Sequence, residues 1–287
     1  MAASPTVLKR RLGQELRKLR RAKGLSAAEV AKQLEWSESK VSRIEGGKSP
    51  LSDKDAKLLL TMYGVQDPEE VRQFIGLTRQ SRQNGWWHSY GDALPEWFKP
   101  YLGFESDAAS ILAIQNELVP GLLQTERYAQ AVIRAMEPEL TADEIEARAS
   151  ARIQRQEILT SEHPPRLWAI LNEAVVRRIV GTPDVMREQL LSLADRAETL
   201  PNVTVQVLPF DAGAHQSMGY SFLVLSFEDI PGSIVYSEGP TSATYLDKES
   251  DLRRHEEIFQ RLVAAAERPE KSIAMIRSIA EEYSHAG

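Results

Sequence analysis

The sequence predicts a multidomain protein, with an all-α domain of five helices followed by an α+β domain with a small antiparallel sheet. The chain has 287 residues, enough for about two domains of ordinary size. Residues 1–82 carry only helical signals, whereas apolar and polar residues alternate in short segments farther along. With 42% hydrophobic and 26% charged residues, the composition is that of a globular protein rather than a disordered one.

The first domain, residues 1–82, is predicted to consist of short capped helices. Leu8, Leu12, Leu16 and Leu19 lie on one face of a first helix, which Gly24 ends. Four further helices are expected to begin directly after residues that cap helix N-termini. These capping residues are Ser26, Ser37, Ser52 and Asp67.

The second domain, residues 83–287, mixes helices and strands after a polar linker at residues 80–85. Strands are expected where apolar and polar residues alternate between turn residues. Helices are predicted at residues 94–115, 124–136, 141–161, 183–199, 246–266 and 270–283, and strands at residues 166–170, 203–208, 220–227 and 233–236.

Charge is divided unevenly along the chain. Residues 1–84 hold 17 Lys and Arg against 10 Asp and Glu, a net charge of +7. The remainder holds 18 against 31, a net charge of −13. A basic domain attached to an acidic one favours contact between the first domain and a polyanion such as a nucleic acid. A chance asymmetry on a solvated surface is the alternative.

Several classes of protein are disfavoured. The chain has no cysteine, which excludes disulfides and thiolate chemistry, and no apolar run long enough for a membrane helix. Its start lacks the apolar stretch of a secretory signal, so we expect a cytoplasmic protein with no membrane contact. The zinc-binding pattern H-E-x-x-H is also missing. It would begin at His255, but its second histidine is replaced by Phe259. Nucleotide-binding and hydrolase motifs are missing, so we expect no catalytic residues, metal or cofactor. An enzymatic second domain is the weaker alternative.

The segment from Ser26 to Gly47 has the pattern of two short helices joined by a tight turn. Ala31 is small where the helices must cross, and Val41 and Ile44 lock the second helix onto the first. This spacing is typical of a helix-turn-helix, whose second helix enters the major groove of DNA. The outer-face residues of that helix, which we predict to contact bases, are Glu38, Ser39, Ser42 and Arg43.

The roles of these side chains follow from their hydrogen-bonding groups. Arg43 can donate two hydrogen bonds to guanine, with a phosphate or the carbonyls of its own helix end as alternatives. Glu38 can accept from a cytosine amino group, interact with the helix dipole, or pair with Ser42. Hydroxyls and cations nearby are predicted to contact phosphates, the alternative being free solvation. The predicted phosphate contacts are Ser26, Ser37, Lys40, Lys48, Arg10 and Arg21.

Residues 37–48, SESKVSRIEGGK, resemble the pattern S-Q-S-x-V-S-R-I-E-N-G-K of the XRE family, whose DNA-binding domains are similar to those of lambda repressor and Cro. Residues 85–90, 94–98, 118–125 and 147–156 resemble the second domain of WhiJ-like, antitoxin-like regulators. The resemblance implies a transcription regulator whose second domain senses a partner or metabolite. The chain departs from the XRE pattern at Ala27, Glu35 and Glu38, where that family has Gln, Gly and Gln. A non-glycine at the turn costs roughly 1 kcal/mol if its backbone is left-handed.

Two groups of residues are candidates for binding a ligand or partner in the second half. The aromatic group could form a cage, although packing in a core or between domains is favoured for it. The polar group could line a pocket, although pairing on helix surfaces is favoured. The aromatic group is Trp86, Trp87 and His88, and the polar group is Glu117, Gln124, Arg152 and Arg155.

One helix-turn-helix reads too few base pairs for specificity, so we expect a homodimer on a pseudo-palindromic operator in double-stranded DNA. The second domain is expected to carry much of the dimer contact and to respond to a small partner protein or a metabolite. Such a protein would work at the nucleoid. The alternative is an antitoxin-like protein whose main role is to bind a small partner protein, with autoregulatory DNA binding.

Overall fold

The computed structural model describes residues 3–228 and 232–283. The chain divides into two compact units, Met1–His88 and Ser89–Gly287. The fold class agrees with the prediction, since a helical unit precedes an α+β unit. None of the helices over the described residues has the length and apolar character needed to cross a membrane.

The first unit is made of five helices around one apolar core, as predicted. Leu16, Val30, Ala56 and Leu60 are among the residues fully buried in this core. The helices are α1 (Pro5–Ala22), α2 (Ala27–Leu34), α3 (Glu38–Glu45), α4 (Asp53–Tyr63) and α5 (Pro68–Gln80).

The four predicted capping residues are confirmed as helix N-caps. In each, a side-chain oxygen accepts a hydrogen bond from a backbone N–H in the first turn of the helix that follows. Ser26 forms a complete capping box, since the carboxylate of Glu29 also accepts from the Ser26 backbone N–H at 2.7 Å. Local chemistry therefore fixes where α2, α3, α4 and α5 begin.

Glu35 ends α2 in a left-handed conformation, with φ 55° and ψ 35°. It is the one non-glycine residue with positive φ in the described part of the chain. We expect Glu35→Gly to raise the free energy of unfolding by about 0.5–1 kcal/mol, because glycine has no Cβ to clash in this region. Urea unfolding of the whole chain measures the change. Glu35→Ala keeps the Cβ and removes the same charge, so an equal gain from alanine would contradict the backbone explanation.

The second unit has seven α-helices and four short 3-10 turns over the described residues. The helices are α6 (Lys99–Ser106), α7 (Glu126–Met136), α8 (Ala142–Gln154), α9 (Glu173–Arg177), α10 (Pro183–Thr199), α11 (Glu249–Ala265) and α12 (Pro269–Glu282). The 3-10 turns are η1 (Trp86–Ala93), which spans the division between the units, η2 (Gly121–Leu123), η3 (Arg155–Thr160) and η4 (Phe210–Ala212).

Six strands form one mixed sheet in the order β3-β2-β1-β4-β5-β6. The pairs β1–β2 and β2–β3 are parallel, and the other three pairs are antiparallel. The strands are β1 (Ser110–Gln115), β2 (Arg166–Asn172), β3 (Val203–Leu208), β4 (Phe222–Ser226), β5 (Ser233–Glu238) and β6 (Ala243–Leu246).

The sheet is larger than expected and is only partly antiparallel. The predicted helix over residues 94–115 is wrong in its last part, because residues 110–115 form the strand β1 near the centre of the sheet. Its apolar run is buried on both faces, and such a run has no strand-like alternation to reveal it. Helices α7 and α8 lie between β1 and β2 in the chain, so the two strands run in the same direction. Strand β6 was also not expected.

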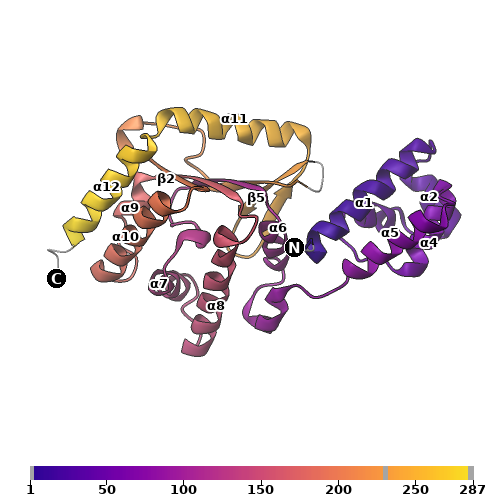
Figure 1. Cartoon of the computed structure of the whole chain (residues 1–287), viewed down its shortest axis with the longest axis horizontal. Coiled ribbons are helices and arrows are strands. Elements are labelled where there is room, and N and C mark those ends of the chain that lie inside the picture. The colour runs from indigo at the N-terminus through magenta and orange to yellow at the C-terminus, as the bar shows by residue number, and fades with distance from the viewer. Residues whose placement is uncertain (1–2, 229–231, 284–287) are drawn as a thin grey trace. The chain divides into compact units, whose positions relative to one another are not determined.

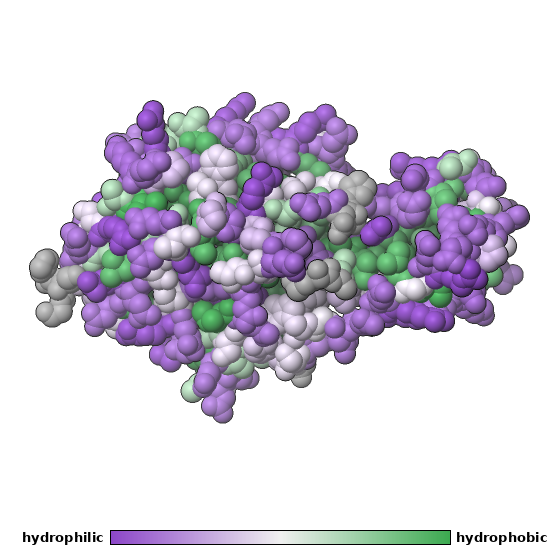
Figure 2. All heavy atoms as spheres, in the orientation of Figure 1, coloured by the Kyte–Doolittle hydropathy of each residue, from purple (hydrophilic) through white to green (hydrophobic). Residues whose placement is uncertain are grey.

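Helices cover both faces of this sheet (Figure 1). Helix α11 lies along one face, where Phe259 and Leu262 pack with Ile114 and Val224. Helices α6, α7, α8 and α10 lie on the other side. Hydrophilic residues cover most of the molecular face seen in Figure 2, as expected when the apolar side chains are used in these cores.

Candidate nucleic-acid interface and ligand cavity

Helices α2 and α3 are joined by a short turn and share one core. Val30 and Ala31 of α2 and Val41 and Ile44 of α3 are all at most 4% exposed and belong to the same buried cluster. These are the contacts that the sequence predicted for a helix-turn-helix. They fix which side of α3 faces the protein and leave the opposite side to solvent.

The four predicted base-contact residues, Glu38, Ser39, Ser42 and Arg43, are all exposed on the outer side of α3. Arg43 Nη1 donates a hydrogen bond to Ser39 Oγ at 2.9 Å, which holds its guanidinium along the helix surface rather than at the helix-end carbonyls. Among the described residues, Ser42 makes no hydrogen bond with Glu38. The outer side of α3 therefore presents one carboxylate, two hydroxyls and one guanidinium to solvent.

Four of the predicted phosphate contacts are exposed residues at helix ends. Ser26 and Ser37 cap α2 and α3, so each stands where the free backbone N–H groups and the dipole of a helix favour an anion. Lys48 follows the end of α3 and Arg21 lies in the last turn of α1, both exposed.

Lys40 and Arg10 are less exposed to solvent than the other predicted phosphate contacts. Lys40 Nζ lies 3.1 Å from the Asp55 carboxylate and 3.5 Å above the ring of Trp36, which is itself packed against the core. Arg10 is only partly exposed, in the first half of α1, where its backbone lies against Gly47. A phosphate contact from Lys40 would have to compete with its existing ion pair.

A buried ion pair between α1 and α3 was not predicted. Arg20 Nε and Nη2 donate to the two carboxylate oxygens of Glu45 at 2.6 and 2.8 Å, and Arg20 Nη1 donates to the Leu25 carbonyl at 2.7 Å. The side chains are 11% and 4% exposed. The hydrogen bonds that Arg20 donates to the Glu45 carboxylate raise the pKa of Arg20. This pair joins the last residue of α3 to α1.

The backbone of α1 also touches the end of α3 directly, at Gly13. A Cβ at this position would lie 2.6 Å from the carbonyl oxygens of both Ile44 and Glu45. That distance is too short for any side chain, so glycine is required for the two helices to approach this closely.

The second unit contains a cavity of about 460 Å³ that is lined by residues of the sheet and of helices α6, α7 and α8. This volume is within the usual range for small-molecule sites. The structure brings the four polar candidates, which come from separate parts of the sequence, together in its lining. They are Glu117, Gln124, Arg152 and Arg155.

Arg155 is a structural member of this lining. Its Nε and Nη2 donate to the Glu105 carboxylate, both at 2.7 Å, and Tyr101 also donates to that carboxylate. The guanidinium lies 5.1 Å from the ring centre of Phe98. Burial lowers the pKa of Arg155, but the hydrogen-bonded charge of Glu105, together with Tyr101 and Glu238, outweighs burial and raises it overall. The bidentate pair thus fully neutralises this arginine within the protein.

Arg152, one turn earlier on α8, has a different environment. Its Nη1 donates to Gln124 Oε1 at 2.9 Å, and no carboxylate of the described residues lies within 4.0 Å of it. Gln124 is buried and held in place by its own donation to the Val119 carbonyl at 2.7 Å. Burial, together with the charge of Arg155, lowers the pKa of Arg152 to about 10. Glu117 is at a more exposed position and pairs with Arg178 at 2.8 Å.

The aromatic candidates Trp86, Trp87 and His88 do not occur among the described residues that line this cavity. Trp87 is buried, with its ring edge-on to Trp86 at 5.9 Å and stacked with His88 at 6.2 Å between centroids. Trp86 and His88 therefore each pack against Trp87.

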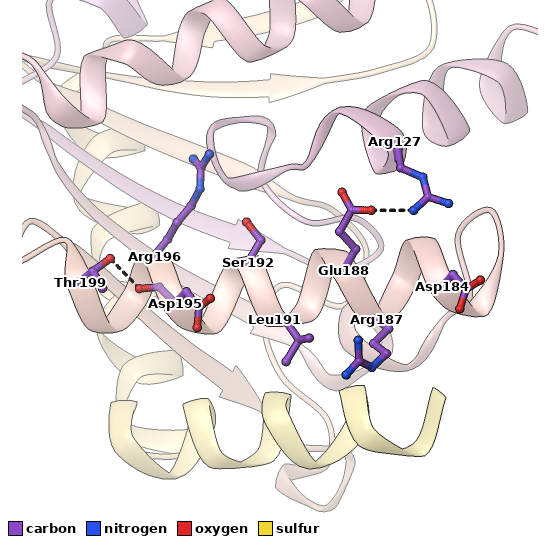
Figure 3. A pocket seen from close by; sticks show the side chains of 9 residues that line it. All are labelled: Arg127, Asp184, Arg187, Glu188, Leu191, Ser192, Asp195, Arg196 and Thr199. Atoms are coloured by element: carbon purple, nitrogen blue, oxygen red, sulfur yellow. Dashed lines mark hydrogen bonds and ion pairs between the residues drawn. The ribbon is translucent and has the colours of Figure 1, made fainter. Parts of the chain in front are cut away.

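A second hollow runs along α10 (Figure 3). Several of its charged side chains are engaged within the protein: Arg127 pairs with Glu188 at 2.8 Å (Figure 3), and Arg196 donates to the Leu122 carbonyl at 3.1 Å. Asp195, on the same helix, pairs with Arg277 of α12 at 2.7 Å. These residues form a mixed charged surface that reinforces contacts between elements.

Comparison with protein families gives two matches. A helix-turn-helix domain model matches residues 11–74, which confirms the prediction for the first unit. A model described as "Domain of unknown function (DUF5753)" matches residues 98–278, more than half of the chain. No curated protein and no solved structure matches the chain.

Proposed function

Because this chain belongs to the DUF5753 family and carries a helix-turn-helix domain at residues 11–74, we propose that it is a sequence-specific transcription regulator of the XRE type. The observation that carries the proposal is the outer side of α3, where Glu38, Ser39, Ser42 and Arg43 are all exposed on a helix held by its opposite side. The net charge of +7 over residues 1–84 supports an encounter with DNA.

In the proposed complex α3 lies in the major groove, which is about 12 Å wide and admits one helix. Arg43 donates to O6 and N7 of a guanine, and Ser39 and Ser42 contact neighbouring bases. Glu38 either accepts from a cytosine amino group or remains a partner of the helix dipole. The capped N-termini of α2 and α3 meet the phosphates on either side.

We further propose a homodimer, because two copies of α3 about 34 Å apart would read two half-sites of a pseudo-palindrome. The second unit then carries dimer contacts and receives the controlling signal in a WhiJ-like manner, with no catalytic step. The protein would act in the cytoplasm at the nucleoid. An antitoxin-like role, in which capture of a small partner protein is the main activity, is the second candidate. Co-purification of a stoichiometric small protein would favour it.

Selection of bound genomic fragments followed by sequencing identifies the operator. On that operator we expect affinity to fall by about 10³–10⁵ between 50 and 200 mM salt if 6–10 phosphates are contacted, because each neutralised phosphate releases counterions. Fluorescence anisotropy with a labelled duplex measures this slope, and a scrambled duplex of equal length gives the non-specific reference. Affinity that is independent of salt would contradict the groove complex.

A further inference from the structure

The lining of the cavity in the second unit contains an unbalanced cation. Arg155 and Arg152 are one turn apart, yet only Arg155 has a carboxylate partner, Glu105. An amide oxygen, that of Gln124, is the acceptor for Arg152. Arg152 is half-buried, and the carboxylates of Glu238 and Glu105 act on it only from beyond ion-pair distance. A guanidinium removed from water without a directly paired anion is costly, and proteins normally supply one.

A second arginine of α8 adds a donor to the same cavity. Arg148 pairs through Nη1 with Glu137, while its Nε is buried without a hydrogen-bond partner among the described residues. Arg148 and Arg152 are four residues apart and therefore on one face of the helix. Both line the cavity. Donors left over from two neighbouring guanidinium groups match the oxygens of a carboxylate or phosphate.

The rest of the cavity is largely apolar and aromatic. Its walls include side chains from other parts of the sequence than the two arginines, namely Trp97, Phe98, Val132 and Ile133. The cavity also includes Gln115, at the carboxyl end of β1, where the sheet changes from parallel to antiparallel pairing. The strand order also reverses between β1 and β4, and ligands of open α/β sheets bind beyond the carboxyl ends of strands where the order reverses.

We propose that this cavity binds a small molecule with an apolar body and one carboxylate or phosphate group, which pairs with Arg152. Ligand control of DNA binding through this site rests on the proposed function, whereas binding of the anion does not.

The test uses three compounds of one shape with the full-length protein: 4-phenylbutyrate, 4-phenylbutyl phosphate and the neutral 4-phenylbutanol. Isothermal titration calorimetry is expected to show that at least one anion binds about tenfold or more tightly than the alcohol, and the two anions distinguish carboxylate from phosphate recognition. Arg152→Gln should abolish this preference. Arg254→Gln removes an equal charge from α11, on the opposite face of the sheet, and should leave it unchanged.

Circular dichroism establishes that Arg152→Gln is folded. Equal affinity of the alcohol and both anions, no binding of either anion, or retention of the anion preference in folded Arg152→Gln would overturn the proposal. DNA binding is measured separately with and without the preferred anion. Anion binding in a protein that binds no DNA would refute the regulator assignment and leave the ligand site intact, so the two failures are distinguishable.

Discussion

Glu45→Ala is expected to lower the free energy of unfolding of the first unit by about 3–5 kcal/mol. Alanine leaves Arg20, with a side chain only 11% exposed, as a buried charge without its partner. That loss is a large part of the about 5–15 kcal/mol that stabilises a typical domain. The bond from Arg20 to the Leu25 carbonyl offsets only part of it. Urea unfolding of the full-length chain, followed by circular dichroism, measures the change.

The matched control removes both charges. Arg20→Met combined with Glu45→Leu replaces the ion pair with apolar side chains of similar size, and we expect it to unfold near the wild-type midpoint or above it. A double variant as unstable as Glu45→Ala would show that apolar packing, and not an unpaired charge, is the origin of the loss. DNA affinity of the double variant would then report how far the pair also orients α3.

Arg43→Ala is expected to weaken binding to the selected operator by about 10–100-fold, corresponding to about 1–3 kcal/mol, and to relax preference at one base pair. The reason is that the planar guanidinium donates two bonds to guanine, which alanine cannot replace. Stability should change little, because Arg43 is exposed and its one described side-chain bond is to Ser39. Anisotropy with operator duplexes substituted one base pair at a time measures both effects.

Arg72→Ala is the matched control for charge, since Arg72 is exposed on α5 and pairs with Glu69 in its own helix. It should weaken operator and scrambled DNA alike and only slightly. If Arg43→Ala behaved in the same manner, weakening every sequence equally, Arg43 would be reassigned to a phosphate contact.

Much of the first unit could be predicted because its signals are local. A hydroxyl at Ser26 or Ser37 bonds to a backbone N–H three residues on, so the sequence alone indicates where each helix begins. The left-handed turn at Glu35 was indicated only by the resemblance to the XRE family, which has Gly at this position. The outer residues of α3 were predictable for this reason too, since helix periodicity assigns them to one face.

The remaining features depend on contacts between distant parts of the chain. Arg20 and Glu45 are 25 residues apart, and nothing near Arg20 distinguishes it from the exposed arginines of α1. Strand β1 is defined by pairing with β2 and β4, so its apolar run is ambiguous when read alone. The sequence alone could indicate single cavity residues as candidates. It could not indicate that Arg155 is paired and Arg152 is not, because that difference depends on Glu105, which is 50 residues from Arg155.

If α3 lies in the major groove as proposed, the close approach at Gly13 would set part of the geometry of that complex on a helix that need not touch a base. With two backbones in contact and no side chain between them, α1 serves as a fixed support that determines how far α3 projects. Even one added methyl group at residue 13 would push the reading helix outward, since the opposing carbonyl oxygens have no rotamer to adopt. In the proposed complex, base-pair preference could therefore change through residues that lie outside the groove.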